Sequence, residues 1–194
     1  FVMMFAVAGI FQLLLAMESK SAVRLFISGM LLGLSIVMKQ SGIFFAAFGG
    51  LVLLYDQIFL QKAKWTKWMT SAMVMATGII LPVALLFLWM FTAGTFDRFW
   101  FWCMSYGSQY AGSESFSRAF SNLKVSLDGL HKDFLILWLL APLGWVLLWS
   151  GNYKYLTKLF ITFLAIVSFA SVFPGLYFRQ HYFVMFLPVL SILA

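Results

Sequence analysis

Lys39 and Gln40 are the polar residues whose position points most strongly to chemistry, because they interrupt an apolar run that extends from residue 25 to residue 59. A lysine at membrane depth costs at least ~2.5 kcal/mol unless it is paired or solvated. One interpretation is a binding site for an anion such as a lipid phosphate. The other is a loop lysine whose flexible stem carries the ammonium group to the membrane surface.

A second polar group follows a helix-stopping Pro-Gly pair near the end of the chain and contains Tyr177, Arg179, His181 and Tyr182. A guanidinium group binds phosphate oxygens through a bidentate fork. The segment therefore predicts a site that holds a phosphate or takes up the charge of a leaving group. The alternative is an interfacial anchor made of aromatic and basic residues at a helix end.

The region from residue 95 to residue 110 is rich in aromatic residues. Phe99, Trp102, Cys103, Tyr106 and Tyr110 recur at the spacing of one helix face, which predicts a helix that lies in the membrane interface with its rings at headgroup level. Stacking of the tyrosines on a sugar is the alternative. Because Cys103 is the only cysteine, an intrachain disulfide and a cysteine zinc cluster are excluded.

Carboxylates are few, and those between residues 92 and 133 are Asp97, Glu114, Asp128 and Asp133. General acid-base chemistry commonly uses carboxylates that act together. None of these four stands in a recognisable pair. We therefore assign no catalytic residue and no metal ligand.

The composition defines the elements that must position these residues. The chain of 194 residues is 63% hydrophobic and only 10% charged, with a mean hydropathy of +0.97, whereas a soluble domain carries about 25% charged residues. This composition predicts an all-α, polytopic transmembrane helix bundle, because helices satisfy their own backbone polar groups in lipid.

About seven apolar segments are expected to cross the membrane, and two of them are truncated by the ends of the chain. They are residues 1–17, 25–38, 43–59, 68–91, 134–149, 156–173 and 182–194. We treat residues 1–194 as one transmembrane domain, with a long outer loop at about 92–133 that carries interfacial helices. Phe1 opens the chain inside an apolar stretch, so a fragment of a longer protein is expected.

Three short connectors, near residues 18–24, 61–67 and 151–158, are basic and share one side by helix parity. The positive-inside rule places them in the cytoplasm. The net charge of +7 then reflects topology and anionic lipid headgroups rather than nucleic acid. Lys39 falls on the outer side, where we expect it to line one outward-opening cavity with Arg179 and with Tyr106 or Tyr110.

Three features, in this order, resemble a known family: the run from Gly33 through Lys39-Gln40 to Gly42, the aromatic segment after Thr95, and the closing Arg179-Gln180-His181. The family is the GT-C fold group of bacterial polytopic glycosyltransferases. It includes dolichyl-phosphate-mannose-type mannosyltransferases and aminoarabinose transferases. The resemblance spans most of the chain, although each motif is short and hydrophobic.

The resemblance implies transfer of a sugar from a polyprenyl-phosphate donor to a lipid, glycan or protein acceptor at the outer face of the bacterial inner membrane. It implies that Lys39, Arg179 and His181 bind the donor phosphate. Sugar or lipid contacts are implied for Gln40, Tyr106, Tyr110, Tyr177 and Tyr182. The family's acidic residue that acts as catalytic base or positions the acceptor is expected upstream of residue 1, so the fragment alone is expected to be inactive. No cofactor is assigned, and a divalent metal in the full-length protein stays open.

Two other functions remain as alternatives. A multi-pass transporter or flippase for an anionic or lipid-linked substrate would also place a cation near membrane depth, but no internal repeat is visible in the sequence. A non-catalytic membrane scaffold is favoured if the outer loops are mobile and the side chains of Lys39, Arg179 and His181 point away from one another. Paired acids in a loop upstream of residue 1 would support the transferase.

Overall fold

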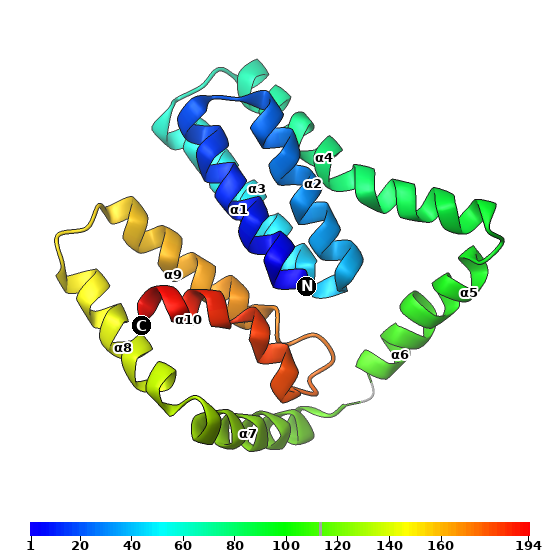
Figure 1. Cartoon of the computed structure of the whole chain (residues 1–194), viewed down its shortest axis with the longest axis vertical. Helices are drawn as coiled ribbons and strands as arrows, with labels where there is room; N and C mark the ends of the chain where they lie inside the picture. Colours follow the sequence, from blue (N-terminus) through cyan, green and yellow to red (C-terminus); the bar gives the residue numbers. More distant parts are fainter. Residues whose placement is uncertain (113) are drawn as a thin grey trace. The chain divides into compact units, whose positions relative to one another are not determined.

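The computed structural model describes residues 1–112 and 114–194, apart from the side chains of residues 110, 111 and 131–133. All regular structure in these ranges is helical (Figure 1). The predicted all-α fold class is therefore confirmed. The chain divides into two compact units, Phe1–Phe99 and Trp100–Ala194. The boundary falls inside the predicted outer loop, and each unit is described by itself.

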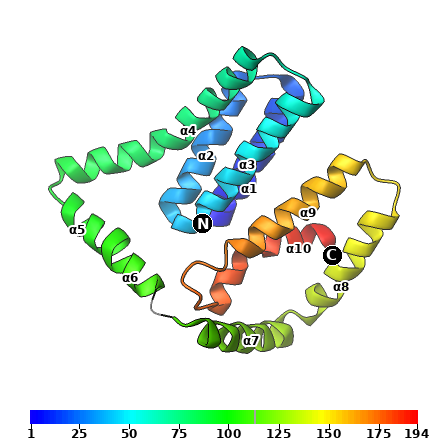
Figure 2. The same cartoon turned by 180° about the vertical axis from the view of Figure 1, so that it is seen from behind.

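The first unit is built from four long helices: α1 (Val2–Ser19), α2 (Ala22–Met38), α3 (Ile43–Tyr55) and α4 (Trp65–Thr92). A 3-10 turn, Gln40–Gly42, joins α2 to α3, and a π-helical turn, Asp56–Leu60, extends α3. Helices α1, α2 and α3 run side by side in alternating directions (Figures 1 and 2). The two basic connectors of this unit therefore lie at one end of the bundle, and the Lys39 turn lies at the other.

Small residues allow α2 to approach its neighbours closely. A Cβ added at Gly29 or Gly33 would collide with the backbone of α4, at the carbonyl oxygens of Met75 and Ile79 respectively. The buried hydroxyl of Ser28 donates a hydrogen bond of 2.8 Å to the Gly9 carbonyl of α1. Glycines spaced four apart and inter-helix serine hydrogen bonds are typical of helices that pack inside membranes.

Helix α4 leaves the bundle in its second half (Figure 1). The change follows Pro82, which lacks a backbone N–H and disrupts the hydrogen-bond ladder of the preceding turn. Pro82 is the last buried residue of α4. Large apolar side chains beyond it, including Leu85, Leu88 and Trp89, are exposed.

The second unit contains α6 (Gly107–Ala111), α7 (Phe116–Asp133), α8 (Leu135–Ser150), α9 (Tyr155–Ala170) and α10 (Leu187–Leu193). The short helix α5 (Phe96–Trp100) lies at the unit boundary, and a π-helical turn, Phe101–Tyr106, leads into α6. Helix α10 packs against both α8 and α9, and α7 turns by 102° from the direction of α8. The predicted aromatic and amphipathic helices of the 92–133 region are thus present.

Among the described residues, three helical stretches are long and apolar enough to cross a membrane: Val2–Ser19, Gln40–Leu60 and Trp65–Thr92. Helices Ala22–Met38 and Tyr155–Ala170 are apolar but shorter. The predicted segment at 182–194 consists of a 3-10 helix, Gln180–Met185, followed by the seven-residue α10. Seven crossings therefore remain a prediction.

Candidate functional site

Lys39 lies in a tight turn between α2 and α3. Its backbone is extended, with φ −159° and ψ 135°, and its N–H donates to the Ser35 carbonyl at 3.1 Å. Gly42 closes the turn by donating to the Lys39 carbonyl at 2.8 Å, and it packs so closely on Ser35 that a Cβ would not fit. Close packing thus fixes the backbone that presents Lys39 and the exposed Gln40.

The Lys39 side chain is half-buried in this turn. Burial lowers the pKa of its ammonium group from the ordinary value of 10.5, because a charged group loses hydration there. An anion that binds the ammonium group would offset this loss. The location is thus consistent with the predicted anion site, and equally with a lysine whose head reaches the surface.

The second predicted cluster is anchored by one buried ring. Phe178 is only 2% exposed and belongs to a core that includes Val172 and Phe183. The neighbouring Arg179 is exposed, and its guanidinium lies 5.7 Å from the centre of the Tyr177 ring. Burial of Phe178 therefore holds the arginine at the surface, where it stacks on an aromatic face.

His181 and Tyr182 continue this cluster. Their rings meet edge to face, with 4.6 Å between centroids. His181 is exposed, whereas Tyr182 is partly buried against the same core as Phe178. The segment thus carries two contacting pairs, Tyr177 with Arg179 and His181 with Tyr182, and their binding roles stay a prediction.

The backbone before Arg179 is strained. Leu176 and Phe178 have positive φ angles of 57° and 45°, which non-glycine residues rarely adopt, and Gly175 has φ 84°. Each such residue costs about 1–3 kcal/mol and persists only where the surrounding structure enforces it. Here the packing of Phe178 and a hydrogen bond of 3.5 Å from the Asn122 side chain to the Leu176 carbonyl hold the segment.

An apolar cavity of about 460 Å³ lies next to this cluster. It is bounded by the end of α7, the start of α8, the 3-10 helix and α10. Its apolar lining includes Trp138, Phe183 and Val184, and its polar members are Gln180 and His181. A mostly apolar pocket with a few convergent polar groups is the usual form of a small-molecule or lipid site.

The remaining predicted contacts are less well defined. Tyr106 is exposed, and its ring lies 5.4 Å from that of Trp102, as expected for one face of an aromatic helix. The side chain of Tyr110 lies outside the described residues. Lys39 and Gln40 belong to the first unit, whereas Tyr106 and Arg179 belong to the second. Their common cavity therefore remains a prediction.

Sequence reasoning missed two features of this region. The cavity beside His181 is formed by residues from four elements, and its walls could not be paired from sequence alone. The left-handed backbone at Leu176 and Phe178 was also missed, since only the preceding Pro-Gly pair signalled a turn. In the part of the chain that the structure describes, no three His, Cys, Asp or Glu side chains gather as a metal site.

Comparisons with known proteins give no assignment. No family model, no curated protein and no solved structure matches the chain. Functional proposals must therefore rest on the residues and on the geometry described above.

Proposed function

We propose that the chain belongs to a multi-pass membrane protein of the cell membrane and that residues 1–194 cross the membrane about seven times. Three observations support this: the long apolar stretches, the close glycine packing of α2 on α4, and the exposed apolar side chains of α4 beyond Pro82. An apolar surface of this kind is stable against lipid chains but not against water. The basic connectors orient the chain with their side in the cytoplasm.

Within this class, the proposed function of the full-length protein is sugar transfer from a polyprenyl-phosphate donor to an acceptor at the outer membrane face. The observation that carries the proposal is the apolar cavity whose polar members include His181, with Arg179 two residues away. A polyprenyl phosphate needs both parts, because its chain must stay among apolar groups while its phosphate must meet cations.

The proposed chemistry is a displacement at the anomeric carbon of the sugar. The bond from this carbon to the phosphate oxygen breaks, and a bond to the acceptor oxygen forms. The departing phosphate takes the electron pair, and Arg179 and His181 stabilise its negative charge. A role for Lys39 in the transfer rests on the family resemblance alone. The residue that removes the acceptor proton is not assigned within this chain, in keeping with the family resemblance.

A transfer assay on the full-length protein tests this proposal. Arg179→Ala is expected to lower kcat for transfer from a polyprenyl-phosphate sugar by roughly 10- to 100-fold. The reason is that it removes a hydrogen-bonding cation that stabilises the negative charge of the departing phosphate. Arg118→Ala changes an exposed arginine of α7 and is expected to leave transfer unchanged. Equal activity of both variants and the unmodified protein would refute the role of Arg179.

Lys39 is tested in the same assay. Lys39→Ala is expected to reduce transfer without preventing membrane insertion, since the turn is held by backbone hydrogen bonds and by Gly42 rather than by the ammonium group. Lys64→Ala, in a basic connector, is the matched control. Unchanged transfer by Lys39→Ala would remove this residue from the mechanism.

A further inference from the structure

We propose that the basic end of the first unit binds a phosphate ester that carries a hydroxyl group, such as the headgroup of phosphatidylglycerol. A cavity of about 280 Å³ lies there, where α1 and α3 end and α2 and α4 begin. Lys20, Lys67, Gln57 and Gln61 contribute its polar lining, with Thr70 and Ser71. The inference rests on the proposed membrane placement and is independent of sugar transfer.

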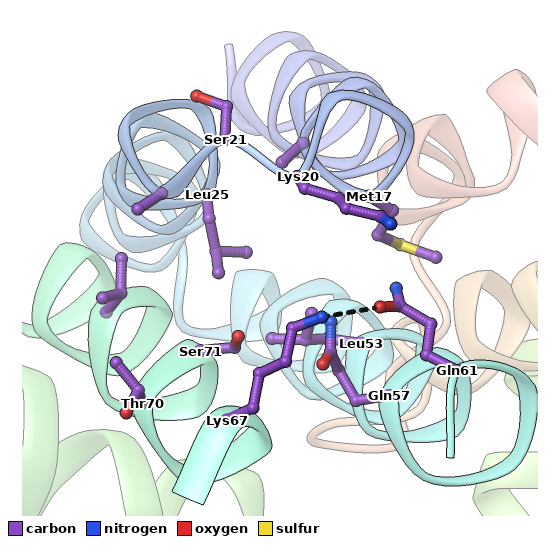
Figure 3. A pocket seen from close by; sticks show the side chains of 13 residues that line it. Met17, Lys20, Ser21, Leu25, Leu53, Gln57, Gln61, Lys67, Thr70 and Ser71 are labelled. Carbon is purple, nitrogen blue, oxygen red and sulfur yellow. Dashed lines mark hydrogen bonds between the residues drawn. The ribbon is translucent and has the colours of Figure 1, made fainter. Parts of the chain in front are cut away.

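Lys67 is positioned by a chain of side-chain hydrogen bonds. The Gln61 amide nitrogen donates to the buried carboxylate of Asp56 at 2.5 Å, which directs the amide oxygen of Gln61 toward the lysine. Lys67 then donates to this oxygen at 3.2 Å (Figure 3). The Asp56 carboxylate is absent from the cavity lining, so an anion in the cavity meets the lysines without direct contact with this acid.

Gln57 supplies the second, independent observation. It is only 7% exposed and lines the cavity, yet its side-chain oxygen accepts no hydrogen bond from the described residues. Figure 3 shows Gln57 among the side chains that line the cavity. A buried acceptor without a donor costs about 1–3 kcal/mol. A ligand hydroxyl would supply that donor.

The two observations together define the ligand. The ammonium groups of Lys20 and Lys67 are exposed and can bind an anion, and the side-chain oxygen of Gln57 can accept a hydrogen bond from a ligand hydroxyl. A phosphate diester with a glycerol headgroup offers both. The cavity volume suits a headgroup, since pockets for larger ligands occupy about 300–1,000 Å³.

The surroundings favour a lipid as the source of this phosphate ester. Trp65 and Trp68 open α4 at this end and their rings meet edge to face, with 4.3 Å between centroids. Tyr55 and Phe59 form a second ring pair at the end of α3, at 5.2 Å. Aromatic and basic residues at the ends of apolar helices mark the headgroup level of a membrane.

Binding to the detergent-solubilised 194-residue chain tests the proposal by titration calorimetry. The probes are dihexanoyl phosphatidylglycerol, dihexanoyl phosphatidylmethanol, which has the same charge but no hydroxyl, dihexanoyl phosphatidylcholine and sn-glycerol 3-phosphate. Saturable binding is expected for phosphatidylglycerol, with weaker binding of phosphatidylmethanol and no saturable binding of phosphatidylcholine. Glycerol phosphate distinguishes the sources: weaker binding assigns the site to lipid, and equal binding assigns it to a soluble ester.

Two variants test the phosphate contact and the hydroxyl contact separately. Lys67→Gln is expected to weaken phosphatidylglycerol and phosphatidylmethanol binding alike, by about fivefold for one lysine. Gln57→Leu is expected to abolish the preference for phosphatidylglycerol over phosphatidylmethanol, which is a change of about three- to tenfold in relative affinity. The thermal unfolding midpoint should not fall. Lys64→Gln, at the same end but outside the cavity, should change neither affinity.

The proposal is overturned if phosphatidylglycerol binds no better than phosphatidylcholine, or if Lys67→Gln and Gln57→Leu both bind it as the unmodified chain does. Because no sugar is transferred in this experiment, its result is independent of the transferase assay. If the full-length protein transfers no sugar but the 194-residue chain still prefers phosphatidylglycerol to phosphatidylcholine, only the proposed function is refuted.

Discussion

At the scale of single residues, two lysines in the basic connectors hold left-handed backbone conformations. Lys20 has φ 52° and ends α1, and Lys62 has φ 48° in the connector before α4. A side chain with a Cβ costs roughly 1 kcal/mol in this region, whereas glycine adopts it freely. Lys20 also lines the proposed phosphate cavity. Lys62 is exposed and does not line it, so its backbone cost can be measured separately.

Lys62→Gly is therefore expected to stabilise the chain by about 0.5–1 kcal/mol, because it removes the cost of the left-handed conformation. Lys64→Gly is the matched control, since Lys64 has an ordinary φ of −59° and gains nothing from glycine. Thermal unfolding in detergent measures both. A midpoint for Lys62→Gly that is equal to or below that of Lys64→Gly would contradict this explanation.

At the scale of elements, the contact between α2 and α4 depends on glycines that leave no room for a methyl group. The backbone of α4 occupies the position where a Cβ of Gly33 would stand. Gly50 of α3 differs, because nothing lies within 4 Å of its added Cβ. The two glycines therefore separate the effect of packing from that of helix propensity.

Gly50→Ala is expected to stabilise the chain by about 0.5–1 kcal/mol through its higher helix propensity. Gly33→Ala is expected to destabilise it by about 1–3 kcal/mol, because α2 and α4 must move apart to admit the methyl group. Unfolding free energies in mixed detergent micelles measure both. Equal changes in the two variants would show that α2 and α4 do not pack as described.

Element positions could be predicted where the sequence pattern was long and uniform. The apolar runs at 1–17, 25–38 and 68–91 correspond to α1, α2 and α4 within a few residues. The division of 182–194 into a 3-10 helix and a short α-helix was not predicted, although Pro188 lies near the start of the second piece. Apolar composition alone does not distinguish these helix types, because packing decides between them.

The candidate site was predictable only in its local part. Adjacent residues such as Arg179 and His181 lie together by chain connectivity, and Pro174-Gly175 signalled the turn before them. The cavity walls come from α7, α8, the 3-10 helix and α10. Such long-range contacts produce no periodic pattern in a single sequence. The unpaired side-chain oxygen of Gln57 could not be predicted for the same reason, since its burial depends on the contact of four helix ends.

At the scale of the whole molecule, the account predicts a defined membrane topology. Helix α4 is about 42 Å long at 1.5 Å per residue, measured along its axis through the bend at Pro82, which exceeds a hydrocarbon layer of about 30 Å. Its two ends should therefore lie on opposite sides. By the positive-inside rule and helix parity, the connector at 151–158 should share the side of the connector at 61–67.

Single-cysteine labelling checks this topology in sealed inverted vesicles, in a Cys103→Ser background. Lys62→Cys and Lys154→Cys are expected to react with a membrane-impermeant maleimide added outside such vesicles, because their cytoplasmic face is exposed. Thr95→Cys is expected to react only after permeabilisation. Equal reactivity of Lys62→Cys and Thr95→Cys in sealed vesicles would contradict a transmembrane α4.

The central claim is that a polyprenyl phosphate binds at the apolar cavity beside Arg179 and His181, and binding of farnesyl phosphate to the 194-residue chain tests it most directly. We expect farnesyl phosphate to bind at least tenfold more tightly than farnesol, because charge-assisted phosphate contacts contribute about 1.5–3 kcal/mol. Val184→Trp fills the cavity and should abolish binding, whereas Ile192→Trp, exposed on α10 and outside the lining, should not. Equal affinity for farnesol, or full binding by Val184→Trp, would contradict the account.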